Sequence, residues 1–171
     1  LGSEHPETLA ATCVLAKLLQ DQGQLAQAEP LFREVLSACR ATLGPEHVDT
    51  ISVSSDLAGL LLAAGNPSEA EALCREALDA SQRTLGDGDP LTLSLIGNLT
   101  HILRAQGRFT EAEPVCREVL SRCRAELGDG DPGTLAAIEM LALILRELGK
   151  LTEAEPLCRE LLEARRARLG D

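Results

Sequence analysis

A block of 42 residues occurs four times along the chain, with no insertion between the copies. The dipeptide Leu-Gly opens each copy, and 11 of the 42 positions carry the same residue in all four copies. A repeat period between about 20 and 50 residues is typical of arrays in which each unit is one supersecondary motif that packs on its neighbours. Such arrays expose extended binding surfaces, so the repeat favours a recognition function.

The four copies span residues 1–42, 43–84, 85–126 and 127–168, and residues 169–171 open a further linker. These borders predict one continuous array over residues 1–171. Because Leu169 and Gly170 repeat the start of a copy, we expect the chain to be a piece of a longer array.

The first half of each copy predicts an amphipathic helix. In the third copy Asp89 is expected to be an N-cap and Pro90 the first helical residue, where its missing N–H removes no hydrogen bond. Apolar residues then recur at steps of three and four until Gly107, which is expected to follow the helix as its C′ residue. The first helix of this copy should therefore cover residues 90–106.

The second half of each copy predicts another helix, over residues 111–127 in the third copy. The stretch Thr110-Glu-Ala-Glu113 has the pattern of a capping box, and Pro114 is expected in the first turn. Acidic and basic residues four apart, such as Glu113 and Arg117, should pair along the exposed side. Short turns between the two helices make them antiparallel. The predicted fold is all-α, a solenoid of four antiparallel helix pairs.

Charge and hydropathy limit the classes of partner. The chain has 16 basic and 27 acidic residues and a formal charge of -11, which disfavours nucleic acid and anionic membranes. A protein or peptide partner that is basic or neutral fits better. Because the sequence contains no apolar run of about 18 residues, we expect no membrane-spanning helix.

The six cysteines are expected to be reduced thiols that pack as small apolar groups. Three of them, Cys74, Cys116 and Cys158, occupy one position in successive copies, where adjacent helix pairs should hold them too far apart for a disulfide. No Cys-x-x-Cys pattern indicates a metal site. Reduced cysteines favour a cytoplasmic location.

Catalytic and cofactor patterns are not found in the sequence. Gly86-Asp-Gly-Asp89 and its equivalent at residues 128–131 lack the distal glutamate of a calcium loop and are expected to cap helices. His5 and His47 stand at the same position as those aspartates and should cap as well. No nucleophile with a paired base and no phosphate loop appears, so we predict that the chain is not an enzyme and needs no cofactor.

Each copy resembles a tetratricopeptide repeat of the 42-residue variety found in kinesin light chains and nephrocystin-3-like proteins. The resemblance rests on Leu-Gly-x-x-His-Pro-x-Thr-Leu in the first copy, then Leu-Ala-x-Leu-Leu, then Gly-x-Leu/Phe-x-x-Ala-Glu-Pro-Leu/Val-x-Arg-Glu-x-Leu. It covers the whole chain. It implies that the solenoid of helix pairs is right-handed. It also implies a concave groove, lined by the first helix of each copy, that holds peptides.

The resemblance also implies which side chains face the groove. These residues are Lys17, Asp56, Asn98, His101, Arg104, Glu139, Met140 and Arg146. The family often has an asparagine just before its Leu-Ala pair, and here only Asn98 matches. Gly59 and Gly97 lie on the same side and are expected to admit the backbone of a ligand.

The leading interpretation is a non-catalytic module that binds a peptide segment of a partner protein in this groove. Two alternatives remain open at this point: an array that self-associates end to end, and the regulatory sensor tail of a larger signalling ATPase. Leu157, Leu161 and Leu162 in the last helix favour the first of these, since they resemble a face that meets a further copy.

Overall fold

The computed structural model describes residues 5–169, and within this range the chain forms eight α-helices and no strand. The predicted all-α class is confirmed. Leu1 and Gly2, which open the first copy, and Gly170 and Asp171, which belong to the predicted last linker, lie outside the described residues.

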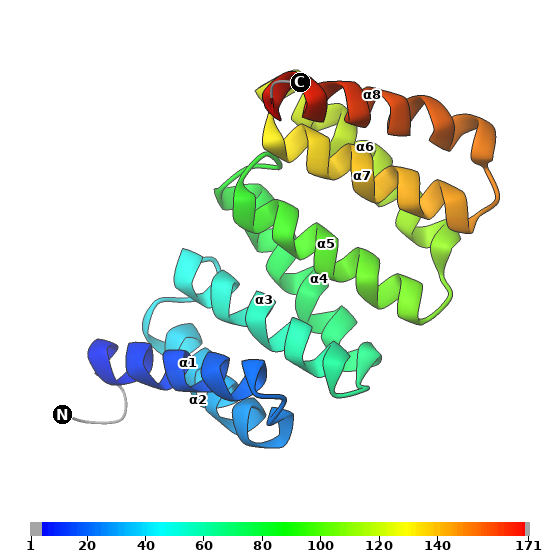
Figure 1. Ribbon diagram of the computed structural model, residues 1–171. Helices are drawn as coiled ribbons and strands as arrows, with labels where there is room; N and C mark the ends of the chain where they lie inside the picture. The colour runs from blue at the N-terminus through cyan, green and yellow to red at the C-terminus, as the bar shows by residue number, and fades with distance from the viewer. Residues whose placement is uncertain (1–4, 170–171) are drawn as a thin grey trace. The chain divides into compact units, whose positions relative to one another are not determined.

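The helices belong to two compact units, Leu1–Thr84 and Leu85–Asp171, and the boundary falls between the second and third copies. Unit 1 contains α1 (Pro6–Asp21), α2 (Leu25–Thr42), α3 (Val48–Ala63) and α4 (Pro67–Thr84). Unit 2 contains α5 (Pro90–Ala105), α6 (Phe109–Leu127), α7 (Pro132–Glu147) and α8 (Leu151–Leu169). Each unit therefore consists of two antiparallel helix pairs, one pair for each copy (Figure 1).

Within each unit the chain packs helix on helix in sequence order. In unit 1, α2 contacts both α1 and α3, and α3 contacts α4. In unit 2, α6 contacts α5 and α7, α7 contacts α8, and the first helices α5 and α7 also touch. Small side chains allow the close approach, since Ala28 on α2 and Ala112 on α6 are both completely buried. The repeated alanine is thus a packing residue.

The first helix of every copy begins at a side-chain cap. In the third copy the N–H of Leu91 donates to Oδ1 of Asp89 at 2.8 Å. The equivalent caps are Asp131 in copy four, His47 in copy two and His5 in copy one. Both predictions, aspartate caps in the later copies and histidine caps in the earlier ones, are confirmed.

One threonine that is identical in all copies ties the linker to the first helix. The hydroxyl of Thr50 donates to the carbonyl oxygen of Gly44 at 2.8 Å, and Thr134 makes the same bond to Gly128 at 2.7 Å. Because the threonine side chains are buried, their hydroxyls need such a partner. This bond accounts for the threonine at this position in copies two and four.

The second helices begin earlier than predicted, and the predicted capping box is wrong. Helix α6 begins at Phe109, its N-cap is Arg108, and no side chain caps it. Gly107, with a φ of 71°, reverses the chain so tightly that the N–H of Arg108 already bonds to the carbonyl of Leu103 at 2.8 Å. The helix starts at the next residue, so Thr110 lies inside its first turn.

The proline of the second helix also lies deeper than predicted. Since α6 begins at Phe109, Pro114 is its sixth residue and lies in the second turn. Proline there cannot donate to the carbonyl of Thr110, the residue four positions earlier. The helix nevertheless continues to Leu127, because its later turns are held by buried residues such as Val119 and Cys123.

The predicted pairs along the second helices are present, and the same arginines also reach the next copy. Arg117 lies 2.8 Å from Glu113 on its own helix and 2.5 Å from Glu153 on α8. Arg33 repeats this arrangement in unit 1, at 2.9 Å from Glu29 and 2.7 Å from Glu69 on α4. Each of these arginines therefore joins the second helices of neighbouring copies.

Candidate functional site

The predicted ligand-contacting residues lie on the solvent-facing side of the first helices. We call this side the groove face; α1 and α3 form it in unit 1, and α5 and α7 form it in unit 2. Each of the eight predicted residues is exposed or half-buried, whereas the repeated Leu57 and Leu141 on the same helices are only 1% and 3% exposed. The groove face is thus physically separate from the packing face.

In unit 1 the two predicted residues of the groove face contact each other. Nζ of Lys17 on α1 lies 2.8 Å from Oδ2 of Asp56 on α3. The hydrogen bond to this carboxylate raises the pKa of the Lys17 ammonium above its ordinary value. A ligand at this place meets a nearly neutral pair rather than a lone cation.

In unit 2 two of the predicted residues, His101 and Arg104, line one hollow of about 320 Å³ at the end of α5 and the start of α6. Phe109 and Glu147 also line it. One carboxylate serves two arginines here, since Glu147 lies 3.9 Å from Arg104 and 3.1 Å from Arg146. Two cations and one anion leave a positive charge beside an aromatic ring, which suits a carboxylate or carbonyl oxygen of a ligand.

The remaining predicted residues of unit 2 have other neighbours. Glu139 on α7 pairs with Arg165 on α8 at 2.6 Å, so the structure directs it toward α8 rather than toward the hollow. Met140 lies near Gly97, where an added Cβ would be 3.8 Å from its Sδ. Asn98 is half-buried beside that contact on α5.

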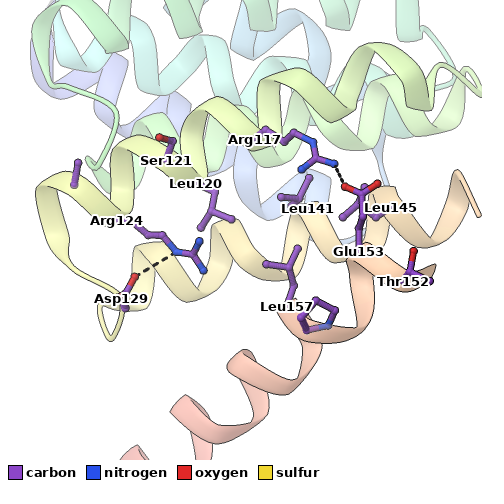
Figure 2. Close-up of a pocket in the computed structure, with 12 residues that line it drawn as sticks. Arg117, Leu120, Ser121, Arg124, Asp129, Leu141, Leu145, Thr152, Glu153 and Leu157 are labelled. Atoms are coloured by element: carbon purple, nitrogen blue, oxygen red, sulfur yellow. Dashed lines mark hydrogen bonds and ion pairs between the residues drawn. The ribbon is translucent and has the colours of Figure 1, made fainter. Parts of the chain in front are cut away.

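A second hollow, which sequence reasoning missed, lies on the opposite side of unit 2. It has a volume of about 890 Å³ and is bordered by α6 and α8, with leucines of α7 in its wall (Figure 2). Figure 2 shows Arg117 reaching Glu153 at one end and Arg124 reaching Asp129 at the other. The sequence contains one indication of this surface. An arginine in one copy is followed 36 residues later by a glutamate in the next copy, and the structure pairs the two side chains.

The cysteines of the described chain have free thiols. Burial raises the pKa of the thiols of Cys13, Cys39, Cys116 and Cys123 above the ordinary value. These groups stay protonated at neutral pH and are poor nucleophiles. Cys158 differs from its equivalents Cys74 and Cys116, because it is exposed while they are buried.

Among residues 5–169, no three histidine, cysteine, aspartate or glutamate side chains are grouped so that they could hold a metal ion. Within the same range, no helix combines the length and the apolar character that crossing a membrane requires.

Comparisons with known proteins agree with the helix pairs. The family model described as tetratricopeptide repeat matches the chain over residues 7–83, 54–114 and 91–167. No curated protein sequence matches the chain.

Similar solved structures cover all or nearly all of the chain. One is the crystal structure of nearly identical TPR-like repeats from a proposed kinesin light chain of Podosopora anserina, with a TM-score of 0.89 and 27% identity over 100% of this chain and 81% of that one. A single-residue variant of the same protein gives a TM-score of 0.91 at 26% identity, with the same coverage of both chains. BtubC (BKLC) from P. vanneervenii is similar in fold, with a TM-score of 0.83 at 19% identity over 96% of this chain and 65% of that one.

Proposed function

The chain belongs to the tetratricopeptide repeat family, and we propose that it is a non-catalytic module that binds a peptide segment of a partner protein on the groove face of unit 2. Tetratricopeptide repeats are generally protein–protein interaction modules. Binding and release of a peptide need no cofactor. Free thiols are consistent with a reducing, cytoplasmic setting for this function.

The hollow beside His101 and Arg104 carries the proposal. It joins an aromatic ring, an imidazole and a guanidinium within one concavity, and these groups suit an extended backbone with an acidic or polar side chain. The position of Asn98 supports it, because an amide at that place can donate to and accept from the backbone of a peptide. The same position is Val14, Asp56 and Met140 in the other copies, whereas the adjacent packing position is leucine in all four.

Selection from a random peptide library displayed on phage tests the proposal. Peptides selected on the whole chain are synthesised, and their affinities are compared between the wild type and the double variant Asn98→Ala plus Arg104→Ala. We expect a loss of at least about tenfold, since each residue supplies hydrogen bonds to the ligand. The control is Ser121→Ala plus Arg159→Ala, which removes one neutral polar side chain and one arginine from exposed positions on α6 and α8.

Equal affinity of the selected peptides for wild type and double variant would contradict this site. Binding that is lost in both double variants would point to a general effect on folding, which thermal melting of each variant detects independently.

End-to-end self-association is a second candidate function, favoured by leucines that are exposed in α1. Leu15 and Leu18 are 49% and 52% exposed, whereas their equivalents on α3, Leu57 and Leu60, are 1% and 0% exposed. Helix α3 packs on α2 of the preceding copy, whereas α1 follows no described copy, and a second molecule could cover its exposed leucines. Size-exclusion chromatography with light scattering tests this: mass that grows with concentration supports it, and a constant monomer mass contradicts it.

A further inference from the structure

Unit 1 contains an apolar recess of about 550 Å³ between the first half of α1, the end of α2 and the start of α3. Leu9, Val35 and Val53 supply aliphatic walls, and Cys13 and Cys39 supply thiols. Since burial keeps both thiols protonated, they act here as small, weakly polar groups. The recess can therefore hold an apolar group.

The recess opens on the groove face. Ala10, Cys13 and Ser52 line it, and all three are solvent-facing or half-buried residues of α1 and α3. An extended segment that lies along the groove face of unit 1 therefore passes over the opening and can insert a side chain into it. The recess is thus part of the same kind of surface as the hollow of unit 2.

The rim of the recess is acidic. Asp49, in the first turn of α3, lines the recess, and its side chain is 67% exposed. The imidazole of His47 lies beside it, with its Nδ1 3.6 Å from Oδ2 of Asp49, and the same nitrogen accepts the N–H of Asp49 as the helix cap. The only lysine of this groove face, Lys17, already pairs with Asp56. The opening therefore favours a cationic neighbour.

Unit 2 differs from unit 1 at the position of Asp49. The residue equivalent to Asp49 is Gly133, and a Cβ placed there would lie 2.7 Å from Leu93 and 3.2 Å from Leu127. These two leucines thus close over the glycine. Their equivalents Leu9 and Leu43 line the recess together with Asp49. The position that carries an acidic side chain beside these leucines in unit 1 therefore carries no side chain in unit 2.

We propose that this recess binds a leucine-sized apolar side chain of a peptide segment whose neighbouring lysine or arginine pairs with Asp49. This inference rests on the proposed function, because it requires a peptide on a groove face, and it adds the chemistry of the ligand at unit 1. The formal charge of -11 for the whole chain favours the same basic segment.

The test is an NMR titration of the isotope-labelled whole chain with short synthetic peptides. The probe is a glycine–serine peptide with one central leucine flanked by a lysine on each side. We expect chemical-shift changes at the backbone amides of Leu9, Cys13 and Ser52. The affinity of this peptide should be about tenfold higher than that of a peptide with serine in place of leucine. A peptide with glutamates in place of the lysines should bind more weakly, and the difference should shrink in high salt.

Variants of the protein provide the matched comparison. Ser52→Leu fills the opening and should weaken the leucine–lysine peptide about tenfold, whereas Ala136→Leu, at the equivalent place in unit 2, should not. Asp49→Asn keeps the helix start and should weaken only peptides that carry lysine, whereas Asp79→Asn on the exposed side of α4 controls for net charge.

The outcomes separate this inference from the proposed function. Chemical-shift changes confined to α5 and α7 would overturn the recess assignment. An affinity that Ser52→Leu and Asp49→Asn both leave unchanged would also overturn it. In either case the peptides selected on unit 2 would still bind, so the proposed function would stand. Shifts at the recess that depend on protein concentration without peptide would show a second copy as the occupant and would also overturn the recess assignment. If Ser52→Leu lowers the melting temperature, its weaker binding could come from a loss of folding. The Asp49→Asn variant, at an exposed position, then tests the recess without that effect.

Discussion

The ammonium group of Lys17 on α1 lies 2.8 Å from a carboxylate oxygen of Asp56 on α3. Both residues were predicted to contact a ligand, and the structure instead joins them to each other across neighbouring copies. The pair bridges the first helices of unit 1 where their side chains meet solvent. A ligand that uses either residue must therefore compete with the other.

This pair should contribute a small, salt-dependent coupling to stability. A double-mutant cycle of Lys17→Met and Asp56→Asn, measured by urea unfolding, is expected to give about 0.2–1 kcal/mol, because both side chains are partly exposed and screened by water. The coupling should decrease in 1 M salt, where the screening length is about 3 Å. A coupling that stays constant as salt rises would show that packing, not charge, joins the two helices.

Ala112 on α6 should not tolerate a larger side chain. It is completely buried where α6 packs on its neighbours, so Ala112→Leu is expected to lower the free energy of unfolding by about 1–3 kcal/mol through overpacking. Ala125→Leu, on the exposed side of the same helix, is the control and should change it by less than about 0.5 kcal/mol. An equal effect of the two variants in urea unfolding would refute the close packing of the helices at residue 112.

Gly97→Ala should stabilise the fold and weaken a ligand on the groove face of unit 2. An added Cβ would lie 3.8 Å from Sδ of Met140, an ordinary contact distance, and alanine favours a helix over glycine by about 1 kcal/mol. The methyl group would, however, occupy the surface where a ligand backbone approaches. Gly59→Ala in unit 1, where a Cβ has no neighbour within 4 Å, should stabilise similarly without affecting that ligand. Calorimetry measures the change in stability, and the affinity of a selected peptide measures the change in binding. An unchanged affinity of the Gly97→Ala variant would show that this glycine has no role in ligand binding.

The parts of the fold that were predictable from sequence depend on local interactions. Asp89 caps a helix through an N–H only two residues away, and Gly107 turns the chain by its own φ of 71°. Both signals occur within a few residues and recur in each copy, so the period, the helix type and the first-helix start were read correctly. The start of α6 was misplaced because a tight turn and a capping box compete for the same residues, and the turn determines where the helix begins.

The missed features depend on residues that the fold brings together from different copies. Arg117 and Glu153 are far apart in sequence, and nothing local to either residue indicates the partner. The recess of unit 1 brings together Leu9 of the first copy with Leu43 and Asp49 of the second, and nothing local to these residues indicates that they share one cavity. The predicted groove residues were correctly placed at the surface. The ion pair between Lys17 and Asp56, however, is not indicated by the sequence, because the two residues lie in different copies.

Glu113 should make stability depend on pH below neutrality. Hydrogen bonds from Lys150 and Arg117 hold the pKa of this carboxyl below its ordinary value. A lowered folded-state pKa stabilises the fold above the unfolded value of about 4.3, and this contribution is lost as the pH falls through the lower folded-state value. Glu113→Gln should thus cost about 0.5–1 kcal/mol at pH 7 and progressively less below pH 4. The check is urea unfolding of both proteins across that range, with the exposed Glu163→Gln as control; a difference that persists at the lowest pH would exclude the charge as its cause.

Exposure predicts a clear order of thiol reactivity with a disulfide reagent such as 5,5′-dithiobis(2-nitrobenzoic acid). Cys158 is the exposed cysteine and should react first, because its thiolate is open to the reagent. Cys13 is half-buried, and desolvation raises its thiol pKa, so it should react more slowly and accelerate as the pH rises. The buried Cys39, Cys74, Cys116 and Cys123 should react only as fast as the units open. Cys158→Ser should remove the fast phase alone, and a fast phase that survives this substitution would show that a buried cysteine is more accessible than the packing of its helix allows.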